Sequence, residues 1–325
     1  MTTTDGTDIA GTVFADGSIS LRLYPHNELG AVEIVDHLCE QAAIGADVGF
    51  DGVMTSEHHG GFAGYLPNPL QITGFQLSAM ERGWAAPCPL LLPLRPIAML
   101  AEEVAWLAAK FPGRVGVGVA PGSLPLDFEA MEIDQGQMMA MFRAGLPRLV
   151  KMLSGRDLGV IEGDRALVAC ADAPIPVISA AMSPAAVRRA ASAGAGVLFE
   201  GGSVIARQRE LADAYVEAGG SGPRILIRRV WLGAPPREAF GAQLDVYRSY
   251  SDDTAIAHWR DDGWICHDDP SALAAELASA MGDANATCLN LRIHAPGIDA
   301  SAATEQIRAL GAEVLPRLRE LLTRS

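Results

Sequence analysis

Two adjacent histidines after a short apolar run have the side chains best suited to acid–base chemistry. His58 and His59 follow the run Asp51–Ser56, and Glu57 precedes them. An imidazole with a pKa near ~6.5 can hold or release a proton reversibly at neutral pH. A strand-end histidine bonded to a backbone carbonyl is the structural alternative. We therefore treat His58 as a candidate proton-handling residue.

The same pair argues against a metal-dependent hydrolase. Successive strand residues point to opposite faces, so His58 and His59 would not reach one interior point together. A binuclear hydrolase uses alternating ligands such as His-x-His with carboxylates on other strands. We predict no metal site.

A second motif, Gly116-Val117-Gly118 with Gly122, superficially resembles a dinucleotide-binding loop. Its spacing is G-x-G-x-x-x-G, and it lies within a predicted strand instead of opening a helix. We interpret Gly116 and Gly118 as small residues that let a strand pack closely, and Gly122 as better placed to approach a ligand.

The elements that would position these residues alternate between strand-like and helix-like segments, which predicts a parallel α/β fold. Eight of each give the (β/α)8 TIM barrel, whose active site lies at the C-terminal ends of the strands. The predicted strands are Ile19–Tyr24, Asp51–Ser56, Ala85–Leu92, Arg114–Ala120, Ile175–Ala180, Val197–Glu200, Ile225–Leu232 and Thr287–His294.

Two gaps between predicted strands are longer than one helix requires, which predicts insertions after strands 4 and 7. Within the first gap, Val160–Val168 is expected to form a small β-hairpin. The second contains Trp259 and Trp264, which could close over the site and exclude water. No linker divides the chain, so we expect one domain over residues 1–325.

Charge and cysteine usage narrow the class of protein. Of the 325 residues, 39 are acidic and 25 basic, and the net charge of -14 disfavours binding to nucleic acids and anionic membranes. The five cysteines are widely spaced without a Cys-x-x-Cys pair, which indicates free thiols. No apolar run approaches the ~20 residues of a membrane span. Without a targeting segment, a cytoplasmic location is predicted.

Several motifs occur in register over some eighty residues, from Asp51 to about Asp134. Together they resemble the bacterial luciferase-like flavin monooxygenases. The motifs are Ser56-Glu57-His58-His59-Gly60, Pro67-Asn68-Pro69, Leu92-Pro93-Leu94-Arg95-Pro96, Ala101-Glu102-Glu103-Val104, Gly113-Arg114-Val115-Gly116-Val117-Gly118 and Asp127-Phe128.

The resemblance implies a TIM barrel that uses reduced flavin mononucleotide (FMN) and molecular oxygen to oxidise a small organic substrate. His58 takes the family's catalytic position, where it would stabilise the flavin peroxide. Because the chain shows no nicotinamide-binding fingerprint, we expect a separate flavin reductase to supply the reduced flavin. A homodimer is expected from the resemblance and from the frequency of two-fold oligomers.

The resemblance also places cofactor-binding residues, and we expect the Cys88–Pro89 bond, on the third strand, to be cis. Apolar and aromatic residues near the strand ends, together with His59, are candidates for a substrate pocket. The cofactor candidates are Glu57, Cys88, Pro89, Ala120, Gly122, Ser179, Ala180 and Ser183, and the substrate candidates are Tyr24, His59, Phe62 and Trp231.

The phosphate site departs from the family pattern, because Ala120-Pro121-Gly122 offers no arginine after the fourth strand. Ser183 at a helix N-terminus is a reasonable anion site or a simple helix cap. Arg95, Arg228 and Arg229 are candidates for the missing charge, and each is equally a candidate for a surface or ion-pair residue.

Two alternatives stay open at this point. One is an oxidoreductase of the same superfamily that uses the deazaflavin F420 and transfers hydride without oxygen. The other is a non-catalytic luciferase-like flavin-binding or subunit protein, which the missing arginine favours and His58 opposes.

Overall fold

A parallel sheet forms the centre of the computed structural model, which describes residues 12–60, 65–241 and 264–323. Neighbouring strands follow the order β3-β2-β1-β10-β8-β7-β6-β5-β4, with β9 paired to β8. The strands are β1 Ile19–Arg22, β2 Gly52–Thr55, β3 Trp84–Pro87, β4 Leu90–Leu91, β5 Val117–Ala120, β6 Val177–Ala180, β7 Gly196–Phe199, β8 Arg224–Leu232, β9 Trp264–His267 and β10 Cys288–Arg292.

The two ends of this order belong to one stretch of chain, because only Cys88 and Pro89 separate β3 from β4. β4 pairs with β5, and a parallel bridge joins Ala85 to Val115 just before β5. The described sheet is therefore a nearly closed TIM-like barrel, as predicted. The expectation of one continuous strand over Ala85–Leu92 is wrong, because the chain breaks at the Cys88–Pro89 bond.

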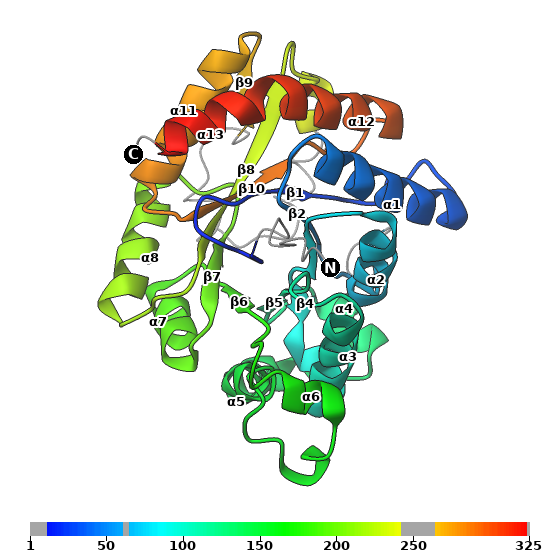
Figure 1. The fold of residues 1–325 in the computed structure, drawn as a ribbon, viewed down its shortest axis with the longest axis vertical. Coiled ribbons are helices and arrows are strands. Elements are labelled where there is room, and N and C mark those ends of the chain that lie inside the picture. Colours follow the sequence, from blue (N-terminus) through cyan, green and yellow to red (C-terminus); the bar gives the residue numbers. More distant parts are fainter. Residues whose placement is uncertain (1–11, 61–64, 242–263, 324–325) are drawn as a thin grey trace, which may run out of the picture.

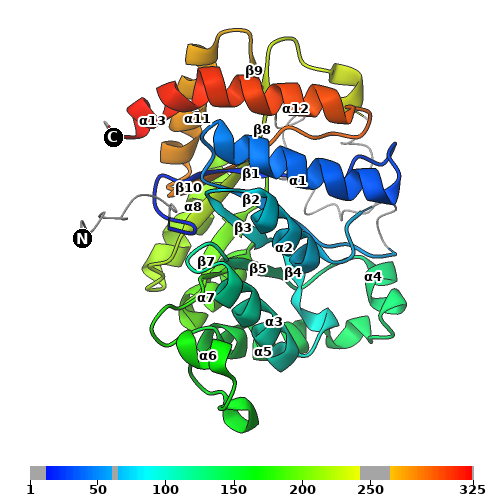
Figure 2. The ribbon, with the colours of Figure 1, turned by 45° about the vertical axis from the view of Figure 1, so that its right-hand side comes forward.

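Helices cover the outside of this ring, as Figures 1 and 2 show. α1 packs beside α2 and α12, α3 beside α5, and α7 beside α8. The helices are α1 Ala31–Asp47, α2 Pro69–Ala79, α3 Ile97–Lys110, α4 Pro125–Ala130, α5 Met138–Met152, α6 Arg165–Ala169, α7 Pro184–Ala193, α8 Ile205–Glu217, α11 Pro270–Asp283, α12 Ala300–Ala309 and α13 Leu315–Thr323.

Alternation along the strands divides the buried side chains into two layers. Leu21, Leu289 and Val119 belong to the large core between the sheet and the helices. Met54 and Ile178 belong to a separate cluster inside the ring. Residues that alternate with the first set therefore point to the barrel interior.

The floor of the barrel is filled by two aromatic rings. The ring centroids of Trp84 and Phe14 lie 4.9 Å apart in an edge-on arrangement. Gly52 leaves room for this plug, because a Cβ there would lie 2.1 Å from the Trp84 ring. A Cβ at Gly116 would lie 2.6 Å from Phe14, and one at Gly118 would lie 2.2 Å from the Cys88 sulfur. These contacts confirm the packing interpretation of Gly116 and Gly118.

The two long connections hold additional elements. Between β5 and β6 lie α4, α5 and α6, and between β8 and β10 lie β9 and α11. The β-hairpin expected over Val160–Val168 is wrong. Asp164 caps α6 by accepting a hydrogen bond of 2.8 Å from the Leu167 amide, and a 3-10 turn over Gly159–Ile161 precedes it. Local capping chemistry thus favours a helical turn over strand pairing.

Two further expectations concern the state of the cysteines and membrane-spanning helices. All five cysteines are free, as predicted. None of the described helices combines the length and apolar character that crossing a membrane requires.

We expect Gly52→Ala to lower the free energy of unfolding by about 2 kcal/mol or more, because the new methyl group overpacks the Trp84 ring. Gly282→Ala is the matched control, since it adds a methyl group to the exposed face of α11 where nothing lies within 4 Å. The control should gain about 0.5–1 kcal/mol from helix propensity. Urea denaturation measures both, and an equal effect of the two changes would contradict the floor packing.

Candidate active site

His58 lies in the loop after β2 and is held by a buried carboxylate from helix α4. Its Nδ1 is 3.0 Å from Asp127 Oδ2, and Asp127 is fully buried in the first turn of α4. The other oxygen of Asp127 accepts a 2.7 Å hydrogen bond from the His59 amide. The His58 side chain keeps 27% of its surface exposed, so the ring is oriented from one side and accessible from another.

Glu57 stabilises the same loop through hydrogen bonds to both of its carboxylate oxygens. One carboxylate oxygen accepts from His59 Nε2 at 2.9 Å, and it also pairs with Arg95. The other oxygen accepts from the Leu91 amide at 2.6 Å. Both oxygens of Glu57 therefore bind groups of the protein itself, and Arg95 forms an ion pair with this carboxylate. The predicted roles of Glu57 toward a cofactor and of His59 toward a substrate stay predictions.

An aromatic wall extends from His58 across the barrel mouth. The rings of His58 and Tyr65 lie 4.8 Å apart, and the Tyr65 hydroxyl is 2.7 Å from Ser56 Oγ. Tyr65 in turn meets Tyr24 edge-on at 5.6 Å, and Tyr24 stacks on His294 at 5.2 Å. These contacts connect the ends of β1, β2 and β10 in one continuous surface.

The Cys88–Pro89 bond is cis, as predicted. The Cys88 carbonyl oxygen accepts a 2.9 Å hydrogen bond from Arg22 Nη1. Burial raises the pKa of the Cys88 thiol to about 11, although the nearby Arg22 opposes this shift. The thiol is therefore neutral at pH 7, which suits a packing role against Gly118 and not that of a nucleophile.

The half of the barrel formed by β5 and β6 has small inward-facing side chains. Ala120 and Ala180 alternate with outward-facing residues in the same way as Gly118 and Ile178. Ser179 is buried on the opposite face of β6, where its hydroxyl contacts the Ala180 carbonyl oxygen at 3.4 Å. The strand periodicity thus places Ser179 on the outward face of β6, and the cofactor role predicted for it stays a prediction.

The remaining cofactor candidates lie in loops at this same end. Gly122 has a φ of +85°, and a Cβ there would meet the Phe128 ring at 3.1 Å, so packing alone accounts for this glycine. Ser183 caps α7, its Oγ accepting from the Ala186 amide at 3.3 Å. The cap is the observed role of Ser183, and an additional anion there stays a prediction.

Trp231 lies on β8 near the mouth and is 9% exposed. Its ring centroid lies 6.2 Å from that of Phe240, which stacks on Trp264 of β9. Phe62 and Trp259 lie outside the described residues.

Sequence reasoning overlooked four residues of this site: Asp127, Tyr65, Arg22 and Arg292. Asp127 stood in a recognised motif, but its 68-residue separation from His59 in the chain hid the contact. Arg22 and Arg292 are the last residues of β1 and β10 and lie within two of the predicted strands, so strand periodicity alone could have found them.

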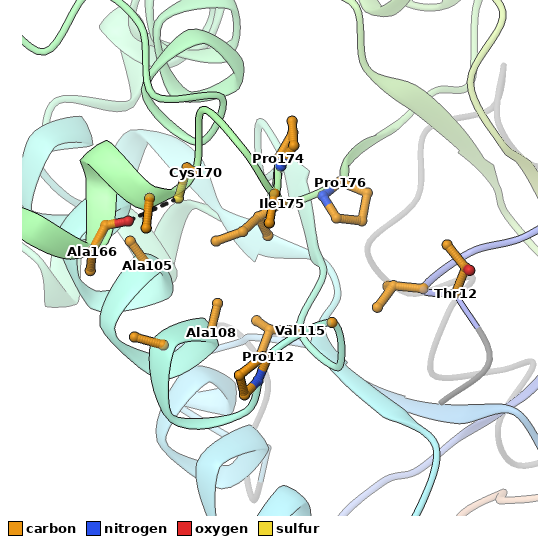
Figure 3. Close-up of a pocket in the computed structure, with 15 residues that line it drawn as sticks. Thr12, Ala105, Ala108, Pro112, Val115, Ala166, Cys170, Pro174, Ile175 and Pro176 are labelled. Carbon is orange, nitrogen blue, oxygen red and sulfur yellow. Dashed lines mark hydrogen bonds between the residues drawn. The ribbon is translucent and has the colours of Figure 1, made fainter. Parts of the chain in front are cut away.

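A separate apolar pocket of about 300 Å³ lies at the opposite end of the barrel (Figure 3). Val115 and Pro176, which line it, precede β5 and β6, so the pocket faces the N-terminal ends of the strands. Its lining carries no charged side chain. In the described parts of the chain, no group of three or more His, Cys, Asp or Glu side chains is arranged to hold a metal ion.

We expect Asp127→Ala to cost about 2 kcal/mol of unfolding free energy, because it leaves His58 Nδ1 and the His59 amide without their acceptor. Asp172→Ala is the control, because Asp172 is exposed on the surface. Urea denaturation compares the two. A loss no larger than that of the control would contradict the anchoring role of Asp127.

Stability should fall as the pH drops below about 6.5, because the pKa of His294 lies well below its ordinary value. Burial, Arg292 and His26 cause this shift, so the unfolded chain takes up a proton that the folded chain refuses. The slope contributed by this group is at most about 1.4 kcal/mol per pH unit.

His294→Phe keeps a ring against Tyr24 and removes the titrating group, and the Nδ1 atom it replaces is buried without a hydrogen-bond partner. Its unfolding free energy, measured by urea denaturation between pH 5 and 8, should depend less steeply on pH than that of the parent. Close to pH 8 the two slopes should coincide. Identical slopes at every pH would show that His294 is not the group responsible.

Comparison with known proteins agrees with this geometry. The luciferase-like monooxygenase family matches residues 19–308. Monooxygenase RslO1 from Streptomyces bottropensis is 19% identical with a TM-score of 0.73, over 92% of this chain and 99% of that one. The oxygenating constituent of 3,6-diketocamphane monooxygenase from Pseudomonas putida, in complex with FMN, is 18% identical with a TM-score of 0.71, over 93% and 99%.

An F420-dependent secondary alcohol dehydrogenase, in complex with an F420–acetone adduct, is 16% identical with a TM-score of 0.70, over 93% of this chain and 98% of that one. No curated protein matches the sequence. Because the family match covers most of the chain, this protein belongs to the luciferase-like monooxygenase family.

Proposed function

We propose that this protein is a flavin-dependent monooxygenase that uses reduced FMN and oxygen to oxidise a small organic substrate. The observation that carries the proposal is the His58–Asp127 pair at the C-terminal end of β2, beside the barrel mouth. A histidine oriented by a buried carboxylate is suited to hold and deliver a proton during redox chemistry.

The residues present fit a planar cofactor. The small inward side chains of Ala120 and Ala180 leave the β5–β6 half of the mouth without bulky groups, and the N-terminus of the ten-residue helix α7 offers backbone amides for a phosphate. Bound reduced FMN would supply the electrons that activate oxygen for transfer to the substrate. Gly118, Ala120, Ala180 and Ser183 are the residues we expect to adjoin it.

His58 would act at its Nε2 atom. The Asp127 carboxylate accepts a hydrogen bond from Nδ1–H of His58, which fixes the neutral tautomer with the lone pair on Nε2. When the ring is protonated, the same carboxylate stabilises the imidazolium, so His58 can exchange a proton without moving. Tyr65 borders the ring, with Tyr24 packed against Tyr65, and together they restrict the access of water from this side.

F420-dependent hydride transfer is the second candidate. No arginine follows β5, where family members that hold FMN commonly carry one, and an F420-dependent dehydrogenase shares the fold. A pocket of about 320 Å³ at the N-terminus of α8, which Gly201, Gly202 and Arg228 help to line, is a second place for a phosphate on this reading. Glu200 already occupies the Gly202 amide at 2.6 Å, which favours the FMN reading.

We expect His58→Gln to keep its affinity for reduced FMN within about twofold and to lose about 100-fold or more in turnover, because it removes the proton-transferring ring. Affinity is measured by quenching of tryptophan fluorescence, and turnover by oxygen consumption with photoreduced FMN. The control is His37→Gln, because His37 is a partly exposed residue of α1 in the outer helix layer.

The same titration tests the cofactor. Tight binding of reduced FMN supports the monooxygenase, whereas a preference for F420 would move the chemistry to hydride transfer. Binding of neither would favour a non-catalytic subunit. Unchanged turnover in His58→Gln would overturn the role of His58.

A further inference from the structure

Two parts of the chain lack acidic residues altogether. Residues 135–156 contain the basic residues Arg143, Arg148, Lys151 and Arg156, and residues 173–199 contain Arg188 and Arg189. The rest of the chain carries all 39 acidic residues. An acidic protein therefore concentrates unopposed positive charge in two places of its sequence.

The fold brings these two parts together on the outside of the barrel. The first contains α5 and the second contains α7, and the two helices pack against each other in the outer layer (Figure 1). The Arg189 guanidinium carbon lies 5.9 Å from the centre of the Phe142 ring of α5. Burial and the charge of Arg143 both lower the pKa of Arg189, so these two guanidinium groups lie close together. We call Arg143, Arg148, Arg188 and Arg189 the basic face.

The side chains of the basic face are available to a partner. Arg143, Arg148 and Arg188 are exposed, and Arg189 is partly buried. Within the described ranges of the chain, none of the four guanidinium groups forms an ion pair or a hydrogen bond. Their hydrogen-bond donors therefore face solvent.

The neighbouring helix α8 shows a different arrangement of surface charge. Arg207 pairs with Glu210 at 2.9 Å, and Arg209 pairs with Asp213 at 3.0 Å. Exposed pairs of this kind contribute at most about 1 kcal/mol to stability. Their absence from α5 and α7 therefore costs the fold little and leaves these charges for another molecule.

Apolar side chains are exposed beside the arginines. Met141 of α5 is 38% exposed, and Met182, which precedes α7, is 54% exposed. Arginine and methionine are enriched in protein–protein interfaces, whereas aspartate and glutamate are depleted. The surface of α5 and α7 therefore has the composition of a docking site.

A pocket of about 260 Å³ lies next to Arg148, and Ile97 and Met141 also line it. No acidic residue is among its lining residues. Arg95 lines it as well, but it forms an ion pair with Glu57. Arg148 is therefore the guanidinium at this pocket that a carboxylate of a partner can reach, and the apolar lining suits a neighbouring aliphatic side chain.

The charge of the whole molecule narrows the class of partner. A net charge of -14 repels a nucleic acid, which carries negative charge along its whole length. A protein can instead present a few carboxylates to the basic face alone. A two-fold dimer centred on this face would place arginine against arginine, which argues against a second copy.

We propose that the basic face is a docking surface for an acidic segment of another protein. Carboxylates of the segment pair with the guanidinium groups, and an apolar side chain beside them enters the pocket next to Arg148. The inference rests on the outer helix layer, so it does not depend on the reaction proposed for the barrel mouth.

The test measures binding of a fluorescein-labelled peptide of glutamate and leucine residues by fluorescence anisotropy. The matched peptide has glutamine in place of every glutamate. We expect the acidic peptide to bind at least about tenfold more tightly, and added salt to weaken it because exposed charges are screened. Equal affinities of the two peptides would overturn the proposal, and so would no binding of the acidic peptide.

The variants place this binding on the basic face. Arg143→Gln and Arg148→Gln should each weaken binding of the acidic peptide about fivefold, and the double variant should weaken it further. Arg209→Gln is the matched control, because it removes the same charge from an exposed, paired position on α8. A similar loss in Arg209→Gln would show that binding follows net charge alone and would contradict a specific face. Circular dichroism checks that each variant folds, and if one arginine variant does not, the other decides.

Two further measurements distinguish the other occupants. A DNA duplex should bind more weakly than the acidic peptide, and sedimentation velocity should give one oligomeric state for the parent and Arg143→Gln. Tighter binding of the duplex, with the same dependence on Arg143, would assign the face to nucleic acid. A change of oligomeric state would assign it to a second copy of the chain. Either result would overturn the proposal.

Discussion

Parallel pairing in register is the constraint on which the site depends. β1, β10 and β8 pair without a slip, so residues at equal height on the three strands share one face of the barrel. A shift of one residue in β1 or β10 would move Arg22 or Arg292 into the helix layer and bring a leucine or an isoleucine inside. The register between β2 and β3 is fixed as well, because Gly52 leaves space for the Trp84 ring at that height.

The same constraint makes the mouth asymmetric. Small side chains at Gly118, Ala120 and Ala180 line the β5–β6 half, and bulky cationic side chains line the half formed by β1, β10 and β8. The aromatic wall of Tyr24 and Tyr65 joins the cationic half to His58.

Much of this fold could be predicted from sequence because it depends on local patterns. Strand periodicity and helix caps act over a few residues, and they located the eight strand positions of the barrel. The hairpin over Val160–Val168 failed because the Asp164 cap outweighed a weak turn signal. The site was harder to predict, since contacts such as His59 with Asp127 and Arg22 with Asn290 join residues far apart in the chain.

The charge inside the barrel contrasts with that of the whole molecule. The chain carries a net charge of -14, yet Arg22, Arg292 and Arg229 are register partners on one interior face of β1, β10 and β8. Burial alone would raise the pKa of Tyr24, but the neighbouring arginines and a hydrogen bond with Tyr65 lower it. Salt screens exposed charges over a Debye length of about 8 Å at physiological ionic strength, whereas buried charges are screened far less. The electrostatic environment of Tyr24 should therefore depend on salt much less than that of the acidic surface does.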